Sequence, residues 1–227
     1  INLKSFKNKV DVLDIGSGPG TALFATIDFI KNRCTTPGVE QPVRNIYLTA
    51  VEQNVHILKD AESLIKKYST DKISFSSKTS RVTEKNCCKT LGDKKFDIIF
   101  LSNILNELCG DDKSALCKKL LDDHLSDSGY LIIIEPALKV ITRNLMRLRD
   151  ELLFSTEGLK VVAPCSFSKP CPMLTLNKRD WCHMYLEWER PKLIVEIDKL
   201  IGNRKDYLKF SYMIFSKMIG EEKADIY

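Results

Sequence analysis

The sequence predicts an α/β fold built on a doubly wound, mostly parallel sheet of seven strands, and three observations support this prediction. Short apolar runs alternate five times with stretches of helical periodicity. Several of these runs are continuously apolar, which is typical of parallel strands buried on both faces. The first run, residues 10–15, leads directly into the glycine-rich loop Gly16-Ser-Gly-Pro-Gly20. A glycine loop at the end of a buried strand is typical of sheets that bind nucleotide-like cofactors.

The strands are predicted where β-branched and other apolar residues cluster over three to seven positions. The third is the weakest, because it consists only of Ile73-Ser-Phe75. The predicted strands cover residues 10–15, 46–51, 73–75, 96–101, 130–135, 159–162 and 209–215.

Helices are predicted between the strands, where apolar residues recur at a spacing of three to four. They cover residues 21–31, 55–68, 113–125, 143–154 and 191–201. We expect three parts along the chain: a cofactor-binding core over residues 1–162, a Cys-rich insertion over 163–190, and a last helix and strand over 191–227 that complete the core.

Composition bounds the class of protein. The 227 residues are 44% hydrophobic and 29% charged, which suits one large domain, or one with an insertion, and argues against disorder. Lysine and arginine total 35 against 30 acids, so the net charge of +5 permits a polyanionic partner without requiring one. We find neither a signal-peptide core nor a transmembrane run, and expect the eight cysteines to be reduced or metal-bound. Because the sequence begins at Ile1, we expect any leader to lie outside it.

The glycine loop indicates which cofactor binds. Its spacing is G-x-G-x-G with Pro19 inside, whereas the dinucleotide fingerprint has G-x-G-x-x-G. Together with the preceding acid, Asp14, the loop resembles motif I of the class I S-adenosylmethionine-dependent methyltransferases. Glu52 ends the second strand, where a carboxylate accepts hydrogen bonds from ribose hydroxyls, and Asn103 follows the fourth strand, near the expected methionine moiety. S-adenosylmethionine is therefore favoured over NAD. The predicted cofactor-binding residues are Asp14, Gly16, Ser17, Gly18, Gly20, Glu52 and Asn103.

Three cysteines, Cys165, Cys171 and Cys182, fall within eighteen residues, and prolines flank two of them. Thiolates are soft ligands that select zinc or iron–sulfur clusters. The spacings match neither zinc ribbons nor ferredoxin runs, so partly buried free thiols remain an alternative. A second alternative is that Pro164-Cys165 imitates the Pro-Cys nucleophile of RNA 5-methylcytosine methyltransferases, although it lies at the margin of the sheet. The remaining cysteines are interpreted as ordinary thiols: Cys34, Cys87, Cys88, Cys109 and Cys117.

Nearly the whole chain resembles the methyltransferase-like proteins of mitochondrial and bacterial small-ribosomal-subunit assembly. The shared glycine motif is Leu13-Asp-Ile-Gly-Ser-Gly-Pro-Gly-Thr-Ala22. The more specific match is Ala163-Pro-Cys with Pro170-Cys-Pro172, followed by Trp181-Cys-His183. Further matching segments are Asn103-Ile-Leu-Asn-Glu-Leu108, Glu135-Pro136, Arg190-Pro191 and Lys209-Phe-Ser-Tyr212.

The resemblance implies a class I, Rossmann-like fold, S-adenosylmethionine as cofactor, and a 4Fe–4S cluster on Cys165, Cys171 and Cys182, with zinc as the alternative metal. It implies action on small-subunit ribosomal RNA, with the assembling small subunit and other assembly factors as partners and no membrane. The expected location is the mitochondrial matrix, or alternatively a bacterial cytoplasm. A four-iron cluster needs four ligands, and the sequence has no cysteine after Cys182, so we expect the fourth from elsewhere. We also expect metal binding to order residues 163–190.

Catalysis is not identified from the sequence. The fourth strand ends in Leu101-Ser-Asn-Ile-Leu105, without the Asp/Asn-Pro-Pro-Tyr/Phe tetrad that holds an exocyclic amine, and no catalytic residue stands out. Three functions stay open: an RNA methyltransferase, an assembly chaperone without turnover, and a small-molecule methyltransferase with structural zinc. Basic residues favour RNA, with a solvated face as the alternative. They are Arg143, Arg147, Arg149, Lys169, Lys178, Arg179, Arg190 and Lys192.

Overall fold

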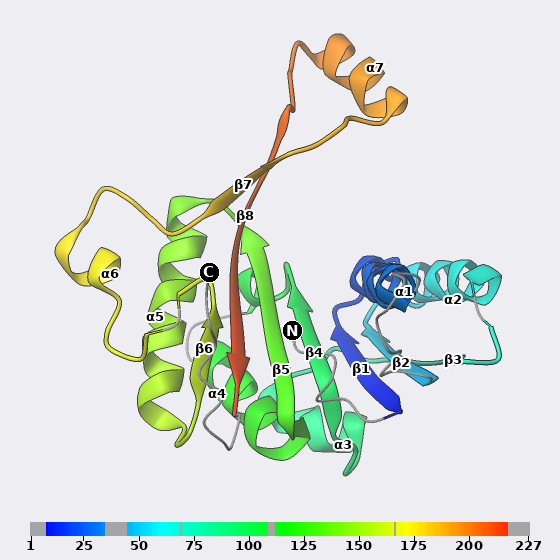
Figure 1. Ribbon diagram of the computed structural model, residues 1–227, viewed down its shortest axis with the longest axis horizontal. Helices are drawn as coiled ribbons and strands as arrows, with labels where there is room; N and C mark the ends of the chain where they lie inside the picture. Colours follow the sequence, from blue (N-terminus) through cyan, green and yellow to red (C-terminus); the bar gives the residue numbers. More distant parts are fainter. Residues whose placement is uncertain (1–7, 35–44, 69, 109–111, 166, 218–227) are drawn as a thin grey trace.

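A computed structural model describes residues 8–34, 45–68, 70–108, 112–165 and 167–217. Figure 1 shows a twisted sheet with helices on both faces and an arm that extends from one edge. The strands are β1 (Lys9–Ile15), β2 (Asn45–Glu52), β3 (Ile73–Thr79), β4 (Phe96–Ser102), β5 (Leu125–Pro136), β6 (Lys160–Ala163), β7 (Met184–Glu187) and β8 (Tyr207–Ser216).

The strand order along the sheet is β3-β2-β1-β4-β5-β8-β6, and β7 pairs with β8 off this path. The first five strands are parallel to one another, whereas β8 runs antiparallel to β5, β6 and β7. Because β1 lies between β2 and β4, the chain reverses its direction of winding at β1. The carboxyl ends of these strands therefore form the crevice in which ligands of such sheets bind.

The sheet has eight strands in the described part of the chain, not the seven predicted from sequence. The strand that was missed is β7, which pairs Met184 with Phe210 and Glu187 with Tyr207. All four of its residues are exposed. A strand without a buried face needs no alternation of apolar and polar residues, so its sequence carries no periodic signal.

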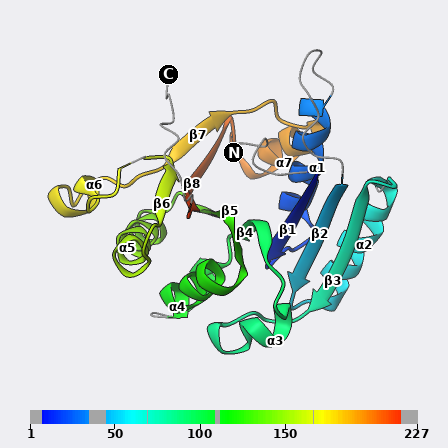
Figure 2. The ribbon, with the colours of Figure 1, turned by 60° about the horizontal axis from the view of Figure 1, so that its bottom comes forward.

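Helices cover the two faces of the sheet (Figure 2). On one face lie α1 (Thr21–Cys34) and α2 (Val55–Tyr68); on the other lie α3 (Cys87–Leu91), α4 (Asp112–Lys119) and α5 (Lys139–Ser155). Neighbouring strand residues point into opposite cores: Ile98 and Ile132 pack with α1 and α2, and Ile99 and Ile133 with the other layer. The continuous apolar runs in the sequence reflect this double burial.

Short helical segments refine the predicted pattern. The helix predicted over 113–125 ends at Lys119 and continues as a π-helical turn, Leu120–His124. Two 3₁₀ turns, Glu84–Asn86 and η3 (Leu105–Glu107), and the short helices α3 and α6 (Pro172–Leu176) were not predicted. Segments of three to five residues are too short to show helical periodicity.

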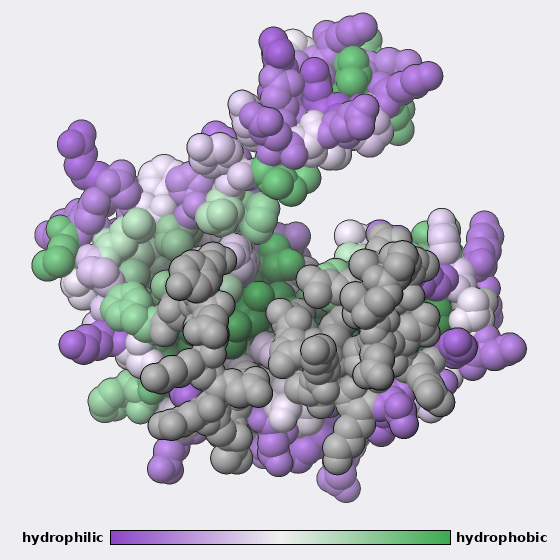
Figure 3. Space-filling model, viewed as in Figure 1, coloured by the Kyte–Doolittle hydropathy of each residue, from purple (hydrophilic) through white to green (hydrophobic). Residues whose placement is uncertain are grey.

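The last helix, α7 (Lys192–Ile201), stands on an arm formed by β7 and the first half of β8 (Figures 1 and 3). Arg190 fastens α7 at the tip of this arm, through ion pairs to Asp198 at 2.9 Å and Asp206 at 3.2 Å. β8 itself continues between β5 and β6 inside the sheet. The division into residues 1–162, 163–190 and 191–227 stays a prediction. Of the last part, β8 lies in the sheet, whereas α7 lies beyond the end of the sheet. No described helix combines the length and apolar character needed to cross a bilayer.

Candidate cofactor pocket and cysteine cluster

The glycine loop turns sharply where β1 ends. Gly16 and Gly18 have φ values of +69° and +51°, in the left-handed region that favours glycine. A Cβ on Gly16 would also lie 2.7 Å from Cδ1 of Ile104. The loop is fastened to the neighbouring strand by hydrogen bonds from the Gly16 and Ser17 amides to the carbonyl oxygen of Val51. Backbone of this kind permits a ligand to approach closely.

Glu52, at the end of β2, contacts the loop directly. Its carboxylate accepts hydrogen bonds from the backbone amides of Gly18 at 3.1 Å and Asn54 at 2.9 Å. Each carboxylate oxygen has a second lone pair, so Glu52 retains the capacity to accept from hydroxyl groups of a ligand. The side chain thus both shapes the loop and lines the cavity beside it.

Asp14 is buried beneath the loop, and its Oδ1 atom has no hydrogen-bond partner among the described residues. Burial, together with the nearby charge of Glu52, raises the pKa of Asp14 to about 7. An ionised carboxylate in this position would be stabilised by a positively charged ligand group. The residue therefore fits a cofactor that carries a cation.

A cavity of about 360 Å³ lies over the ends of β1, β2 and β4. It brings together Gly16, Gly18, Glu52 and Asn103 of the predicted residues. Asn103 has a φ of +58°, and its backbone N–H donates to the carbonyl oxygen of Ile134 at 2.8 Å. Asp14, Ser17 and Gly20 are not on the cavity wall. Lining residues that sequence reasoning missed are Ile15, Gln53, Asn54, Ile57, Ser80, Arg81, Val82, Ser102, Ile104, Glu107 and Leu108.

The missed residues Ser80, Arg81 and Val82 come directly after β3. The rule that placed Glu52 and Asn103, that parallel strands end at one edge, applies to them equally. The weak third strand was predicted to end four residues too early, at Phe75 instead of Thr79. Residues 80–82 were therefore not recognised as lying at the end of a strand.

The cysteine block lies beside α5, at the opposite end of the sheet from α2 (Figure 1). Cys171 is buried, and Cys165 and Cys182 are half-buried against the core. The pKa of the Cys182 thiol is raised first by burial and then by the charges of Cys165 and Cys171. That the three thiols share one metal site stays a prediction.

Two arginines of α5 hold this block. Arg149 is fully buried and donates hydrogen bonds to the carbonyl oxygens of Phe167 and Lys169, while Asp150 accepts from the Cys171 amide. Arg143 donates to the carbonyl oxygens of Leu174, Asn177 and Asp180, at 2.8–3.0 Å.

Trp181 Nε1 adds a bond to the carbonyl oxygen of Ala137. The block has hydrogen bonds of its own, so its order does not depend on a metal alone. Of the basic residues that favoured RNA in the sequence, Arg149 is fully buried, and Arg143 and Arg190 bond to groups of the protein itself.

The chemical type of the three cysteine side chains suits a thiophilic metal, because soft thiolates in a half-buried site bind zinc or iron. Their arrangement in space does not form such a site, because no group of three or more His, Cys, Asp or Glu side chains in the described residues lies close enough to hold a metal ion. A bound metal or cluster would therefore require the thiols to move together and would need further ligands. The cluster remains a proposal.

The strand order, the antiparallel strand inserted beside β5 and the glycine loop at the end of β1 define a Rossmann-like class I methyltransferase fold. A putative methyltransferase from Bacillus halodurans C-125 shares this fold, with a TM-score of 0.52, 11% identity and 96% of each chain covered.

The chain belongs to the Rsm22 family, whose model, described as mitochondrial small ribosomal subunit Rsm22, matches residues 4–224.

Two more distant structures also align. A precorrin-6y C5,15-methyltransferase from Geobacter metallireducens GS-15 has a TM-score of 0.49 and 12% identity, with 96% of this chain and 84% of that chain covered. An rRNA methylase from Streptococcus thermophilus has a TM-score of 0.46 and 10% identity, with 96% and 92% covered. No curated protein matches the chain.

Proposed function

We propose that this chain is an S-adenosylmethionine-binding, methyltransferase-like factor that acts on small-subunit ribosomal RNA during ribosome assembly and so supports translation. The observation that carries the proposal is the cavity at the end of β1, where Glu52 and the glycine loop meet above the unpaired oxygen of Asp14. The family description supports the small subunit as partner and the mitochondrial matrix as location.

Residues on the cavity wall and the buried Asp14 beneath it would each interact with a different part of the cofactor. Glu52 would accept hydrogen bonds from the ribose hydroxyls, and the loop backbone at Gly16 and Gly18 would hold the amino acid end. Asp14 supplies a negative charge that balances the cationic groups of the cofactor. Ile57 and Val82 offer apolar surface for the adenine ring. When bound, S-adenosylmethionine supplies an electrophilic methyl group on a sulfonium.

A second candidate is an assembly factor that binds the cofactor without turnover. The segment after β4 favours this candidate. Its Leu105 and Asn106 line a different cavity. Asn103, Ile104 and Glu107 line the cofactor cavity. Asn103 and Ile104 carry no basic group, and no side-chain hydrogen bond that would orient the Glu107 carboxylate as a general base is found among the described residues. In both candidates the three cysteines hold a structural 4Fe–4S cluster.

Isothermal titration calorimetry with S-adenosylmethionine tests the proposal. Gly18→Arg places a long side chain at the mouth of the cavity and should abolish binding. Glu52→Ala should weaken binding roughly tenfold or more, because it removes charge-assisted hydrogen bonds. The matched control is Glu151→Ala, an exposed glutamate of α5. Unchanged affinity in both Gly18→Arg and Glu52→Ala would refute the assignment. Methyl incorporation into ribosomal RNA from radiolabelled cofactor then separates the enzyme from the binding factor.

A further inference from the structure

A second cavity, of about 350 Å³, lies beside the cofactor pocket on the other side of the turn that follows β4. Within that turn, Ile104, Glu107 and Leu108 line the cofactor pocket, whereas Leu105 and Asn106 line the second cavity. The two cavities therefore share one wall. None of the predicted cofactor residues lies on the second cavity.

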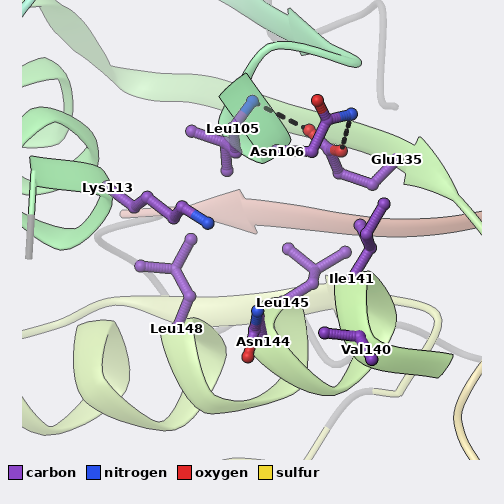
Figure 4. A pocket seen from close by; sticks show the side chains of 9 residues that line it. All are labelled: Leu105, Asn106, Lys113, Glu135, Val140, Ile141, Asn144, Leu145 and Leu148. Carbon is purple, nitrogen blue, oxygen red and sulfur yellow. Dashed lines mark hydrogen bonds between the residues drawn. The ribbon is translucent and has the colours of Figure 1, made fainter. Parts of the chain in front are cut away.

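Aliphatic side chains face each other across this cavity (Figure 4). Leu105 projects from η3 on one side, and Ile141, Leu145 and Leu148 project from α5 on the other. Leu105, Leu145 and Leu148 are buried, so these walls are held in place by the core. A space bounded by aliphatic side chains on two opposite sides suits a flat ring.

Polar groups approach the space between these walls. The Lys113 ammonium points into the cavity, and no hydrogen bond or ion pair to it is found in the described part of the chain. Asn144 accepts a hydrogen bond from Arg147 through Oδ1, which leaves its Nδ2 free to donate. Asn106 donates through Nδ2 to Glu135, and its Oδ1 has no hydrogen bond among the described residues, so it can accept one. A ligand thus meets two donors and one acceptor.

Glu135 holds Leu105 and Asn106 in place on their side of the cavity. Its carboxylate is buried and accepts from the Leu105 amide at 2.9 Å and from Asn106 Nδ2 at 3.0 Å. Burial raises the pKa of Glu135, and these hydrogen bonds and the charge of Lys113 oppose that rise. Because Glu135 and Lys113 carry opposite charges, the cavity has little net charge. This balance favours a neutral ligand over a free anion.

We propose that this cavity binds one unstacked RNA base, held between Leu105 and the α5 side chains and recognised at its edge by Lys113, Asn106 and Asn144. A base is a flat, neutral ring whose edge carries both donors and acceptors, and proteins read single-stranded bases in this way. The inference rests on the proposed action on RNA. The shared wall separates this base from the cofactor, so the cavity recognises RNA and is distinct from the methyl acceptor position.

Fluorescence anisotropy with two labelled 12-mers tests this inference: a single-stranded RNA of mixed sequence, and a backbone of abasic units of equal length. Lys113→Met and Lys118→Met each remove one positive charge from α4, but only Lys113 lines the cavity. For the RNA, Lys113→Met should lower affinity roughly tenfold, the usual effect of losing a contact to a base edge. Lys118→Met should lower it about twofold, and the two variants should behave alike on the abasic backbone.

Ile141→Trp fills the cavity without removing a charge, and should abolish the preference of the protein for RNA over the abasic backbone. Circular dichroism checks that each variant is folded. In addition, 4-thiouridine placed in the RNA should crosslink to peptides of α4 or α5. Equal losses for Lys113→Met and Lys118→Met on both oligomers, with the preference intact in Ile141→Trp, would overturn the inference while RNA binding stands. If the wild type binds neither oligomer, the proposed RNA partner fails as well.

Discussion

Arg149, in the middle of α5, donates a hydrogen bond to the carbonyl oxygen of Lys169 at 3.0 Å, across twenty residues of chain. The same guanidinium also bonds the carbonyl oxygen of Phe167, packs over its ring, and pairs with Asp150. Asp150 in turn accepts from the Cys171 amide. An ion pair between the buried Arg149 and the half-buried Asp150 thus connects the helix to the loop that carries two of the three clustered cysteines.

Replacing this arginine should release the cysteine loop. Arg149→Leu leaves two carbonyl oxygens without their donor and Asp150 without its cation, which should cost about 3 kcal/mol of the free energy of unfolding. Residues 165–182 should become sensitive to limited proteolysis. Arg147→Leu, an exposed arginine two residues earlier, is the control and should change neither measurement. Equal protease resistance in the two variants would contradict the role of Arg149.

The buried carboxyl of Asp14 should make stability fall as pH rises. Its pKa is about 7 in the folded protein, against an ordinary value of 3.8. A raised pKa means that the folded state binds the proton more tightly, so this contribution is complete below pH 4 and is lost as pH rises through 7. The loss should be at most roughly 4 kcal/mol.

Urea denaturation at several pH values measures this effect. Asp14→Asn should remove this part of the decrease between pH 4 and 7, whereas Asp28→Asn on the exposed face of α1 should retain it. S-adenosylmethionine should reduce the decrease in the wild type, because its cationic groups stabilise the ionised carboxylate. A wild-type slope identical to that of Asp14→Asn would show that Asp14 titrates normally.

RNA binding should be mainly electrostatic and should weaken steeply with salt. Lys178 and Arg179 are exposed beside the cysteine block, whereas Arg190 holds the arm and is unsuitable as a probe. Lys178→Glu with Arg179→Glu should lower affinity and reduce the slope of log K against log salt by about 0.7 per lost contact. Lys66→Glu with Lys67→Glu, on the last turn of α2, changes charge equally and is the control. Salt-independent binding would favour a small-molecule substrate.

Anaerobic purification should yield a brown protein with iron and little zinc. Cys165→Ser should remove the visible absorption, because the cluster loses a thiolate. The protease resistance of residues 165–182 should persist, since Arg143 and Arg149 still hold them. Cys88→Ser, an exposed cysteine on α3, is the matched control and should stay coloured. Stoichiometric zinc, or a disulfide between two of the three cysteines, would refute the cluster.

The sequence by itself determined the sheet, because burial on both faces leaves a direct record as apolar runs such as residues 10–15 and 130–135. The glycine loop and Glu52 were also readable, since parallel strands end at one edge and positive φ selects glycine. The exposed strand β7 left no such record, because nothing about it had to be buried.

Only the tertiary structure decided what individual polar side chains do. Arg143, Arg149 and Arg190 look like surface cations in the sequence, yet in the fold they bond backbone carbonyls or buried carboxylates. The second cavity is equally invisible along the chain, because Asn106, Lys113, Glu135 and Asn144 come from four different elements. Periodicity records which side chains leave water, whereas the partner of each polar group depends on contacts between segments far apart in sequence.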